Sequence, residues 1–508
     1  MKGDMEQPVI KTLGALKAAG YKSRGVKQEI RENLIRSIRE KQSPFRGILG
    51  YEDTVIPDVE RALLSRHNIL FLGLRGQAKT RMAREMVNLL DEWIPIIEGS
   101  EINDNPFAPI SHFGRMMVEE KGDETPIAWL HRSERYGEKL ATPDVSVADL
   151  IGDIDPIKAA NLRLSFADER VIHYGIIPRS NRGVFVINEL SDLQARIQVS
   201  LFNILQEGDI QIRGFKLRLP LDILFVFTAN PEDYTNRGSI VTPLKDRIES
   251  QIITHYPKST ELSRAITEQE ADVLDEQMQR VEVPELCRIL VEQIAMEARR
   301  SEYVDHKSGV SARLTISAFE NLVSTAERRA LREGSTRTMV RIADFIGVIP
   351  AITGKIELVY EGEQEGAANV AYRLLGQSIR TLFTSYFPDP QTFKRNASGG
   401  KQKSNPYQPV IDWFGKGNEL VLLQDADDQE YLQQLYSVYG LYNAVKQFYP
   451  QADDAQMALL MEFLLHGLSE FSLISKKGID SGGYSFGDIL GSMLNMNFDL
   501  DEEDEQDM

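Results

Sequence analysis

The sequence has a single cysteine, Cys287, and seven histidines, no two of which are four residues apart. One cysteine can form neither an internal disulfide nor a metal site built from several cysteines. No apolar run approaches the roughly 18 residues of a membrane-spanning helix, and the first residues lack the apolar core of a signal peptide. These absences predict a cytoplasmic protein with no membrane span.

Basic residues are scarce relative to acidic ones. The chain has 58 Lys and Arg against 76 Asp and Glu, which gives a formal net charge of −18. A general nucleic-acid binder needs a basic face, so we expect no nucleic-acid partner. Seven acidic residues fall between Asp499 and Met508. Such a run of like charge is typical of a solvated, disordered tail; a regulatory or docking role is the alternative.

The length of the chain bounds its organisation. A chain of 508 residues is too long for one hydrophobic core and predicts two to four domains. With 42% hydrophobic and 26% charged residues, the composition is that of a soluble globular protein.

A short apolar run, 69–72, leads into a glycine-containing loop that closes on Lys79 and Thr80. Apolar residues at helical spacing follow, which gives the strand–loop–helix context of a phosphate-binding loop. Gly73 and Gly76 let the backbone bend so that its N–H groups point inward, and the helix N-terminus favours an anion. Lys79 would reach the β- and γ-phosphates of a nucleotide, and the Thr80 hydroxyl would ligate Mg²⁺. A glycine-rich turn without a ligand is the alternative.

The predicted nucleotide site has one departure from the usual loop pattern, because Ala78 stands where a glycine normally precedes the lysine. An alanine can adopt the conformation of a helical first turn, so the loss is modest if this residue has a negative φ. Ile48 lies in a turn upstream of the first strand, where it would contact an adenine ring; a buried loop residue is the alternative. The predicted nucleotide-binding residues are Ile48, Gly73, Arg75, Gly76, Gln77, Ala78, Lys79 and Thr80.

The segment 183–188 has four consecutive apolar residues and ends at Asn188, which Glu189 follows. Such a run predicts a parallel strand buried on both faces, and open α/β sheets bind ligands at the carboxyl ends of their strands. Glu189 would orient and deprotonate the attacking water. Asn188 stands where an aspartate usually supports Mg²⁺, so we expect it to bind the ion through water and, lacking charge, to slow turnover. A buried strand that ends in a solvated acid is the alternative.

Two more buried strands are predicted after this one. Residues 222–231 are apolar up to a polar tip that includes Asn230, and residues 251–256 form the next strand. The intervening segment 209–219 alternates apolar and polar residues on both sides of a Gly-Phe turn, which predicts a hairpin.

Five features, taken in order, resemble AAA+ ATPases over roughly residues 45–360: the phosphate loop, the strand ending in Glu189, the strand ending at Asn230, Arg247, and Arg313 in a helical region. The chain is most similar to the helix-2-insert clade, which contains MoxR-type ATPases and magnesium-chelatase I subunits. The resemblance implies an α/β fold, with a AAA+ P-loop core in which helices flank a parallel sheet. A helical lid and a further helical C-terminal region would follow this core.

The resemblance and the composition together imply a division into regions. The predicted regions are an N-terminal helical arm, 1–44; the nucleotide-binding domain, 45–258, with the insert at about 147–177 and the hairpin at 209–219; the helical lid, 259–370; a helical C-terminal extension, 371–475, with a linker near 396–406; and an acidic, disordered tail, 476–508.

The resemblance also implies the remaining site residues. Asn230 would be sensor 1, Arg247 the arginine finger and Arg313 sensor 2, and together with Glu189 they make up the predicted catalytic set. For each of these taken singly, a surface ion pair or a strand-end cap is the alternative. The implied cofactors are ATP and Mg²⁺, the latter bound by Thr80 and, through water, by Asn188. An arginine finger acts on the neighbouring subunit, so the protein would form a homo-oligomer, by family precedent a hexameric ring.

Three functions remain open. The leading hypothesis is an ATPase that remodels or assembles a partner protein carrying a von Willebrand A-type domain. The nearest rival is the motor subunit of a magnesium or other metal chelatase in tetrapyrrole biosynthesis. The third is an ATP-gated scaffold with little hydrolysis, suggested by Asn188. Sigma-54-type transcription activation is not expected, because the Gly-Ala-Phe-Thr-Gly-Ala loop is absent.

Overall fold

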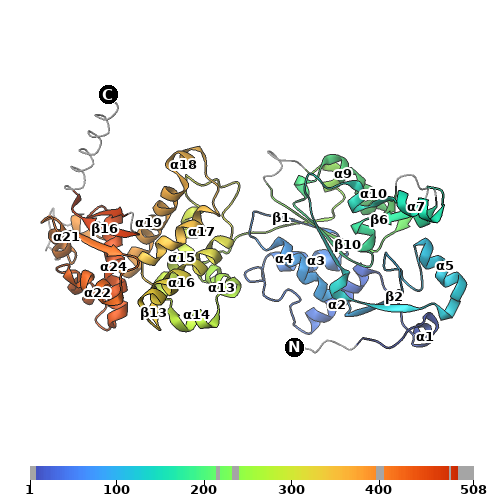
Figure 1. The fold of residues 1–508 in the computed structure, drawn as a ribbon, viewed down its shortest axis with the longest axis horizontal. Coiled ribbons are helices and arrows are strands. Elements are labelled where there is room, and N and C mark those ends of the chain that lie inside the picture. Colours follow the sequence, from blue (N-terminus) through green and yellow to red (C-terminus); the bar gives the residue numbers. More distant parts are fainter. Residues whose placement is uncertain are drawn as a thin grey trace, which may run out of the picture. The chain divides into compact units, whose positions relative to one another are not determined.

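The computed structural model describes residues 7–166, 168–212, 218–231, 240–395, 405–479 and 482–489. It divides the chain into two compact units, Met1–Tyr256 and Pro257–Met508 (Figure 1). Each unit has its own hydrophobic core. The boundary lies close to the predicted end of the nucleotide-binding domain at residue 258.

A parallel sheet of five strands forms the centre of the first unit, in the order β11 (Ser250–Ile253), β1 (Ile69–Leu72), β10 (Ile223–Ala229), β7 (Gly183–Asn188) and β4 (Tyr136–Leu140). All neighbouring strands pair in parallel. β7 and β10 are buried along their whole length, which is why their sequences are continuous apolar runs. The predicted α/β class, with a parallel sheet flanked by helices, is confirmed.

Successive residues of β10 pack on opposite faces of this sheet. Leu224 and Val226 belong to one core, and Phe225 and Phe227 belong to the other. The first core also contains residues of α2 (Val26–Arg39), α3 (Val55–Leu64) and α4 (Lys79–Glu85), and the second contains residues of α9 (Ala195–Ser200) and α10 (Phe202–Glu207). Figure 1 shows these two sets of helices on either side of the sheet.

α2 is integrated into the first unit and does not form a separate arm. Its residues Val26, Ile30 and Leu34 are buried in the core, and Glu29 forms a buried ion pair with Arg135 at 2.7 Å. The predicted arm, 1–44, therefore differs from the structure, because the apolar stripe of an amphipathic helix needs a surface to pack against. The short helix α1 (Leu13–Ala18) precedes it.

The predicted insert and hairpin both contain antiparallel strand pairs. In the insert, β5 (Gly152–Ile154) pairs with β6 (Ile172–Tyr174), beside α6 (Val147–Leu150), α7 (Pro156–Leu162) and α8 (Ile176–Arg179). In the hairpin, β8 (Asp209–Gln211) pairs with β9 (Arg218–Pro220); its predicted turn lies outside the described residues. A third pair, β2 (Trp93–Ile97) and β3 (Ile127–His131), flanks α5 (His112–Lys121). α12 (Thr242–Lys245) precedes β11.

The second unit is mainly helical, as predicted. Its helices are α13 (Thr260–Glu270), α14 (Asp275–Arg280), α15 (Glu285–Ala298), α16 (Arg313–Glu333), α17 (Ile349–Thr353), α18 (Tyr360–Glu365), α19 (Ala367–Tyr386), α20 (Gln391–Arg395), α21 (Gln408–Phe414), α22 (Asp428–Ser437), α23 (Leu441–Lys446) and α24 (Asp454–Glu470). The two short strands β12 (Val281–Glu282) and β13 (Thr338–Met339) pair in parallel.

Two predicted boundaries in this unit differ from the structure. The division between lid and extension at 370/371 falls inside α19, and a single apolar core joins residues from both sides of it. The predicted tail, 476–508, begins within a three-stranded antiparallel sheet of β14 (Leu420–Leu423), β16 (Gly483–Gly487) and β15 (Ser475–Gly478). Tyr484 and Phe486 are buried in the core, so these residues pack despite their polar neighbours. Most of the predicted linker, and residues 490–508, lie outside the described residues.

None of the described helices combines the length and the apolar composition that a membrane span requires.

Candidate nucleotide-binding site

The predicted phosphate loop follows the carboxyl end of β1, and α4 begins at Lys79. Gly76 has a φ of +71° and Ala78 a φ of +54°. Both angles lie in the left-handed region, which glycine adopts freely and alanine adopts only at a cost. The condition under which an alanine would cost little, a negative φ at position 78, is therefore not met, because the bend that leads into α4 passes through a positive φ. This conformation explains why glycine is usual at this position.

The Lys79 side chain is only 7% exposed, and its ammonium group donates hydrogen bonds to oxygens at the ends of two strands. It contacts Gly73 O, Leu74 O at 3.0 Å and Asn230 Oδ1 at 2.9 Å. Asn230 directly follows β10, which lies beside β1 in the sheet. The structure thus brings Lys79 and the predicted sensor Asn230 into direct contact.

Three hydroxyl groups that sequence reasoning missed hold the phosphate loop. The Tyr51 hydroxyl lies between two carbonyl oxygens, Gln77 O at 3.0 Å and His255 O at 2.8 Å. The Thr254 hydroxyl donates to Gln77 Oε1 at 2.7 Å, and the Tyr256 hydroxyl donates to Arg75 O at 3.0 Å. Burial raises the pKa of Tyr51 to about 12, so its hydroxyl remains a donor at neutral pH. Thr254 and Tyr256 follow β11, the neighbour of β1 in the sheet. Knowledge of this strand pairing would have predicted that the two residues lie near the phosphate loop.

The same contacts explain the first glycine of the loop. A Cβ on Gly73 would overlap the Thr254 hydroxyl and the side-chain oxygen of Gln77. Gln77 is buried, whereas Arg75 and Ala78 are exposed. The loop is therefore fixed to the sheet through Gln77.

Thr80, Asn188 and Thr228 form a hydrogen-bonded group at the ends of β7 and β10. Thr80 Oγ1 donates to Asn188 Oδ1 at 3.0 Å, and Thr228 Oγ1 donates to the same oxygen at 3.1 Å. The N–H of Glu189 donates to Thr228 Oγ1 at 3.2 Å. Glu189 is half-buried and has a φ of +54°, an uncommon conformation that persists where the surroundings enforce it. The two predicted metal-site residues, Thr80 and Asn188, are therefore in contact.

Glu138, on the edge strand β4, is a further polar residue of this group. Its Oε1 accepts a hydrogen bond from Asn188 Nδ2 at 2.6 Å. Arg84 donates two hydrogen bonds to the same carboxylate, at 3.0 and 3.1 Å, and the Tyr136 hydroxyl donates a third at 2.8 Å. Burial, and then the nearby carboxylate, raise the pKa of Tyr136. Sequence reasoning missed Glu138, because no local pattern marks a single glutamate on a strand.

These residues fit a nucleotide with Mg²⁺. Hydroxyl and amide oxygens such as Thr80 Oγ1 and Asn188 Oδ1 are ligands for a hard cation, which in nucleotide sites also binds phosphate oxygens. Within the described ranges, no group of three or more His, Cys, Asp or Glu side chains is placed to hold a metal ion, so such an ion would depend on the phosphates. The Lys79 ammonium and the loop N–H groups would bind the phosphates themselves. The Glu189 carboxylate can accept a proton from water.

The structure places Ile48 in the interior of the first unit. Its side chain is 6% exposed and packs in the core with α2, α3 and α4. Ile48 is therefore a buried loop residue, which was the alternative to an adenine contact. The adenine contact itself stays a prediction.

The two predicted arginines lie outside this hydrogen-bonded group. Arg247 donates to Gln206 Oε1 at 2.9 and 3.1 Å and to Pro243 O at 2.7 Å, and its guanidinium carbon lies 4.8 Å from the centre of the Phe202 ring. These contacts fix it against α10. Arg313 is an exposed residue at the start of α16 in the second unit. The arginine-finger and sensor-2 roles therefore stay predictions.

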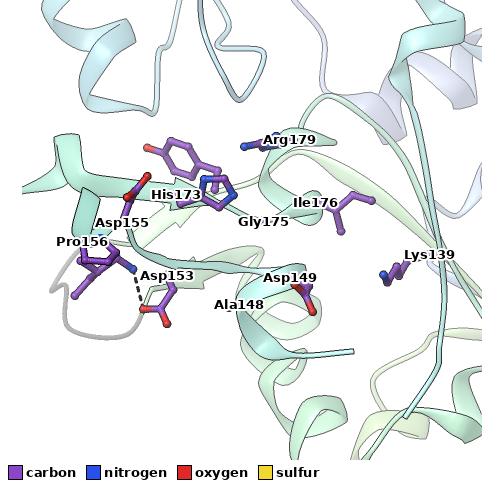
Figure 2. A pocket seen from close by; sticks show the side chains of 12 residues that line it. Lys139, Ala148, Asp149, Asp153, Asp155, Pro156, His173, Gly175, Ile176 and Arg179 are labelled. Carbon is purple, nitrogen blue, oxygen red and sulfur yellow. Dashed lines mark hydrogen bonds between the residues drawn. The ribbon is translucent and has the colours of Figure 1, made fainter. Parts of the chain in front are cut away.

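A separate cavity of about 570 Å³ lies between β4 and the insert. Figure 2 shows charged side chains of both signs around it. They are the basic residues Lys139 and Arg179 and the acidic residues Asp149, Asp153 and Asp155; the His173 imidazole also lines the cavity. Because the two signs are mixed, the lining favours no single charge class of ligand.

A sequence model described as the Sigma-54 interaction domain matches residues 163–253. The matched segment is well under half of the chain and contains β7, β10 and β11. It therefore spans the strands that carry Glu189 and Asn230 at their ends.

Two curated relatives are magnesium-chelatase 38 kDa subunits. The one from Cereibacter sphaeroides is 23% identical over 44% of this chain and 61% of its own length. The one from Rhodobacter capsulatus is 24% identical over 43% of this chain and 57% of its own length. This chain thus spans about three-fifths of the length of these relatives.

Among solved structures, a chain from the complex between subunits BchI and BchD of magnesium chelatase is 19% identical. The overlap covers 63% of this chain and 98% of that chain, with a TM-score of 0.32. A TM-score this low supports no argument. The parallel sheet flanked by helices and the two sequence relatives support the predicted resemblance to AAA+ ATPases and, among them, to the magnesium-chelatase I subunit.

Proposed function

We propose that this protein binds ATP and hydrolyses it in the presence of Mg²⁺. The observation that carries the proposal is the meeting of Lys79, Asn230, Thr80 and Asn188 at the carboxyl ends of adjacent parallel strands. Ligands of open α/β sheets bind at this edge. A buried lysine beside the N-terminus of a helix is suited to a polyphosphate.

The roles of the side chains follow from their positions. Lys79 would neutralise the charge that develops on the phosphates, and Asn230, in contact with it, would help to orient the attacking water. Glu189 would accept the proton of that water. Asn188 would hold the metal through water, and its lack of charge makes slow turnover the expected behaviour.

The wider function proposed is that of a motor. Arg247 would complete the site of a neighbouring copy, and Arg313 would couple the nucleotide to the helical lid, so that a homo-oligomeric ring, with six copies by family precedent, does work on a partner protein. A chaperone-like remodeller in the manner of MoxR-type ATPases, acting on a partner with a von Willebrand A-type domain, is the form we favour.

The second candidate function is the motor subunit of a magnesium chelatase. The two magnesium-chelatase relatives favour it. Deletion of the gene from an organism that makes magnesium tetrapyrroles separates the candidates: a lost product supports the chelatase, and an unchanged pigment profile supports the remodeller.

Phosphate release from ATP with Mg²⁺, together with equilibrium binding of ATP, tests the main proposal. We expect Lys79→Ala to lower both by about 100-fold or more, and Glu189→Gln to keep binding while turnover is lost. Lys121→Ala, at the exposed end of α5, is the control. A wild-type protein that binds no ATP would contradict the proposal, and one that binds ATP without releasing phosphate, even with its partner, would favour the ATP-gated scaffold.

A further inference from the structure

Glu138 lies beside the proposed metal position, on the strand next to β7. β4 pairs in parallel with β7, with Leu140 opposite Asn188 and Glu138 opposite Val186. The Glu138 side chain therefore reaches along the sheet to Asn188, and its Oε1 lies 2.6 Å from Asn188 Nδ2. The Glu138 side chain is 22% exposed, so it is largely removed from water.

The hydrogen bonds around Asn188 fix the orientation of its amide. Two hydroxyls, those of Thr80 and Thr228, donate to its Oδ1, and its Nδ2 donates to Glu138. An ionised carboxylate accepts hydrogen bonds and donates none, so the nitrogen must face Glu138. An aspartate at position 188 would instead place two carboxylates in contact, which disfavours ionisation of both. The neutral residue at 188 is therefore matched to the charged residue at 138.

We infer that Glu138 supplies the negative charge that Asn188 lacks and that it is a positioning residue for the Mg²⁺ of the nucleotide. Glu138 holds the Asn188 amide so that Asn188 Oδ1 stays beside the Thr80 hydroxyl. The negative charge of Glu138 would also attract the ion, although Asn188 lies between the two. In this chain the carboxylate that usually supports the metal has moved from the end of β7 to the neighbouring strand. The inference rests on the proposed function, because it concerns the same site.

Arg84 gives this inference a test that distinguishes charge from structure. Arg84 is on α4, which begins at Lys79, and it forms a two-pronged ion pair with Glu138. If the pair only ties α4 to β4, removal of either partner weakens the site in the same direction. If the Glu138 charge serves the metal, removal of Arg84 leaves that charge less neutralised and acts in the opposite direction.

The measurement is binding of a fluorescent, non-hydrolysable ATP analogue to the full chain during a Mg²⁺ titration. Second-layer substitutions typically cost 10–100-fold in metal affinity, so we expect Glu138→Gln to raise the half-saturating Mg²⁺ concentration by about tenfold. Binding of the analogue in EDTA should change little. Arg84→Gln should lower the half-saturating concentration, by about threefold. Glu120→Gln, an exposed carboxylate on α5, is the matched control.

An exchange of the two groups provides a rescue. In the double variant Glu138→Gln with Asn188→Asp, the carboxylate and the amide change places and the hydrogen bond between them is kept. We expect this variant to bind Mg²⁺ within about threefold of wild type. Should the single variant Glu138→Gln fail to fold, as thermal melting would show, the exchange variant and Arg84→Gln still decide the question.

The outcomes separate this inference from the proposed function. A wild-type protein that binds no analogue at any Mg²⁺ concentration overturns both. A wild-type protein that binds the analogue, with an unchanged Mg²⁺ requirement in Glu138→Gln or with an equal rise in Glu138→Gln and Arg84→Gln, overturns the inference alone.

Discussion

Buried charged groups occur in both units of the molecule, and their surroundings differ. At the phosphate loop of the first unit, the Lys79 ammonium donates to carbonyl and amide oxygens, which carry no formal charge; elsewhere in this unit, Glu29 and Arg135 form a buried ion pair. In the second unit, Arg329 and Asp344 are both 0% exposed and form an ion pair at 3.0 Å. Arg329 also donates to Thr338 Oγ1 at 2.8 Å.

Glu462 is a further buried acidic residue in the second unit, and it is held by hydrogen bonds from neutral groups. The Glu462 carboxylate accepts hydrogen bonds from the N–H groups of Ile342 and Ala343 and from the Tyr431 hydroxyl, each at 2.8 Å. It joins η6 (Ala343–Val348) to α24.

The difference between the surroundings of Lys79 and those of Arg329 and Asp344 indicates what these buried groups do. Neutral oxygens around a cation can be replaced by phosphate oxygens, so the surroundings of Lys79 are compatible with binding an anionic ligand. Opposite charges buried in contact cannot separate without leaving one of them unpaired in a low-dielectric interior. Arg329, Asp344 and Glu462 therefore serve the fold of the second unit.

The largest expected effect is on the stability of the second unit. Arg329→Met leaves Asp344 buried without its partner and should lower the free energy of unfolding by about 3–5 kcal/mol. The control is Arg328→Met, at the preceding residue, which removes an exposed ion pair with Asp425. This substitution should change the free energy of unfolding by about 0–1 kcal/mol. Urea unfolding of the full chain, followed by circular dichroism, measures both. Equal effects of the two variants would show that burial does not distinguish these pairs.

The pH dependence of stability sharpens the same contrast. Burial raises the pKa of Glu462 to about 7 from an ordinary 4.5, so between these values the folded protein keeps a proton that the unfolded chain has lost. The free energy of unfolding should therefore fall as pH rises from about 4.5 to about 7 and level off above that. Glu462→Gln should remove this slope, and Glu430→Gln, exposed on α22, should keep it. Urea midpoints across this pH range test the prediction; a rise of stability with pH in wild type alone would contradict it.

A smaller effect is expected at the phosphate loop. Tyr51→Phe removes the hydroxyl that holds Gln77 O and should weaken ATP binding by about fivefold, the equivalent of one hydrogen bond worth about 1 kcal/mol. Tyr360→Phe, an exposed tyrosine of α18, is the control. Equilibrium binding of ATP decides the question, and unchanged affinity in Tyr51→Phe would mean that this hydroxyl does not set the loop conformation.

The smallest effect concerns the backbone of the loop. Ala78→Gly relieves a left-handed conformation and should raise the free energy of unfolding of the first unit by about 1 kcal/mol. Ala83→Gly, in the right-handed helix α4 that follows, should lower it by about 1 kcal/mol. Thermal or urea unfolding measures whether each substitution raises or lowers the free energy of unfolding. Destabilisation by both substitutions would show that the left-handed angle at Ala78 carries no strain.

Local sequence patterns were enough to locate the phosphate loop and the strands β1, β7, β10 and β11, whereas the edge strand β4 was not predicted. β7 and β10 could be predicted from the sequence, because strands covered on both faces must be apolar throughout. The positions of Lys79 and Thr80 in the phosphate loop could be predicted, because this kind of loop has a fixed residue spacing. The sequence did not decide what Ala78 costs, because the spacing specifies which residue occupies a position and leaves its backbone angle open.

The contacts that complete the site join distant parts of the chain. Thr254 and Gln77 are 177 residues apart, and Glu138 and Asn188 are 50 apart. No periodicity links such pairs, since they meet only when strands take their places in the sheet. The same holds for the predicted tail, where β16 pairs with both β14 and β15 in a way that composition did not reveal.

By itself, the sequence determined the elements of this protein: apolar runs that must be buried, a glycine loop that must bend, and polar residues at the points where strands end. The tertiary structure alone decided which of those ends are neighbours, that Asn188 faces a glutamate, and that the predicted arm and extension share cores with their neighbours. The physical reason is that burial and local geometry are properties of short segments, whereas hydrogen-bond partners depend on strand order, which no short segment contains.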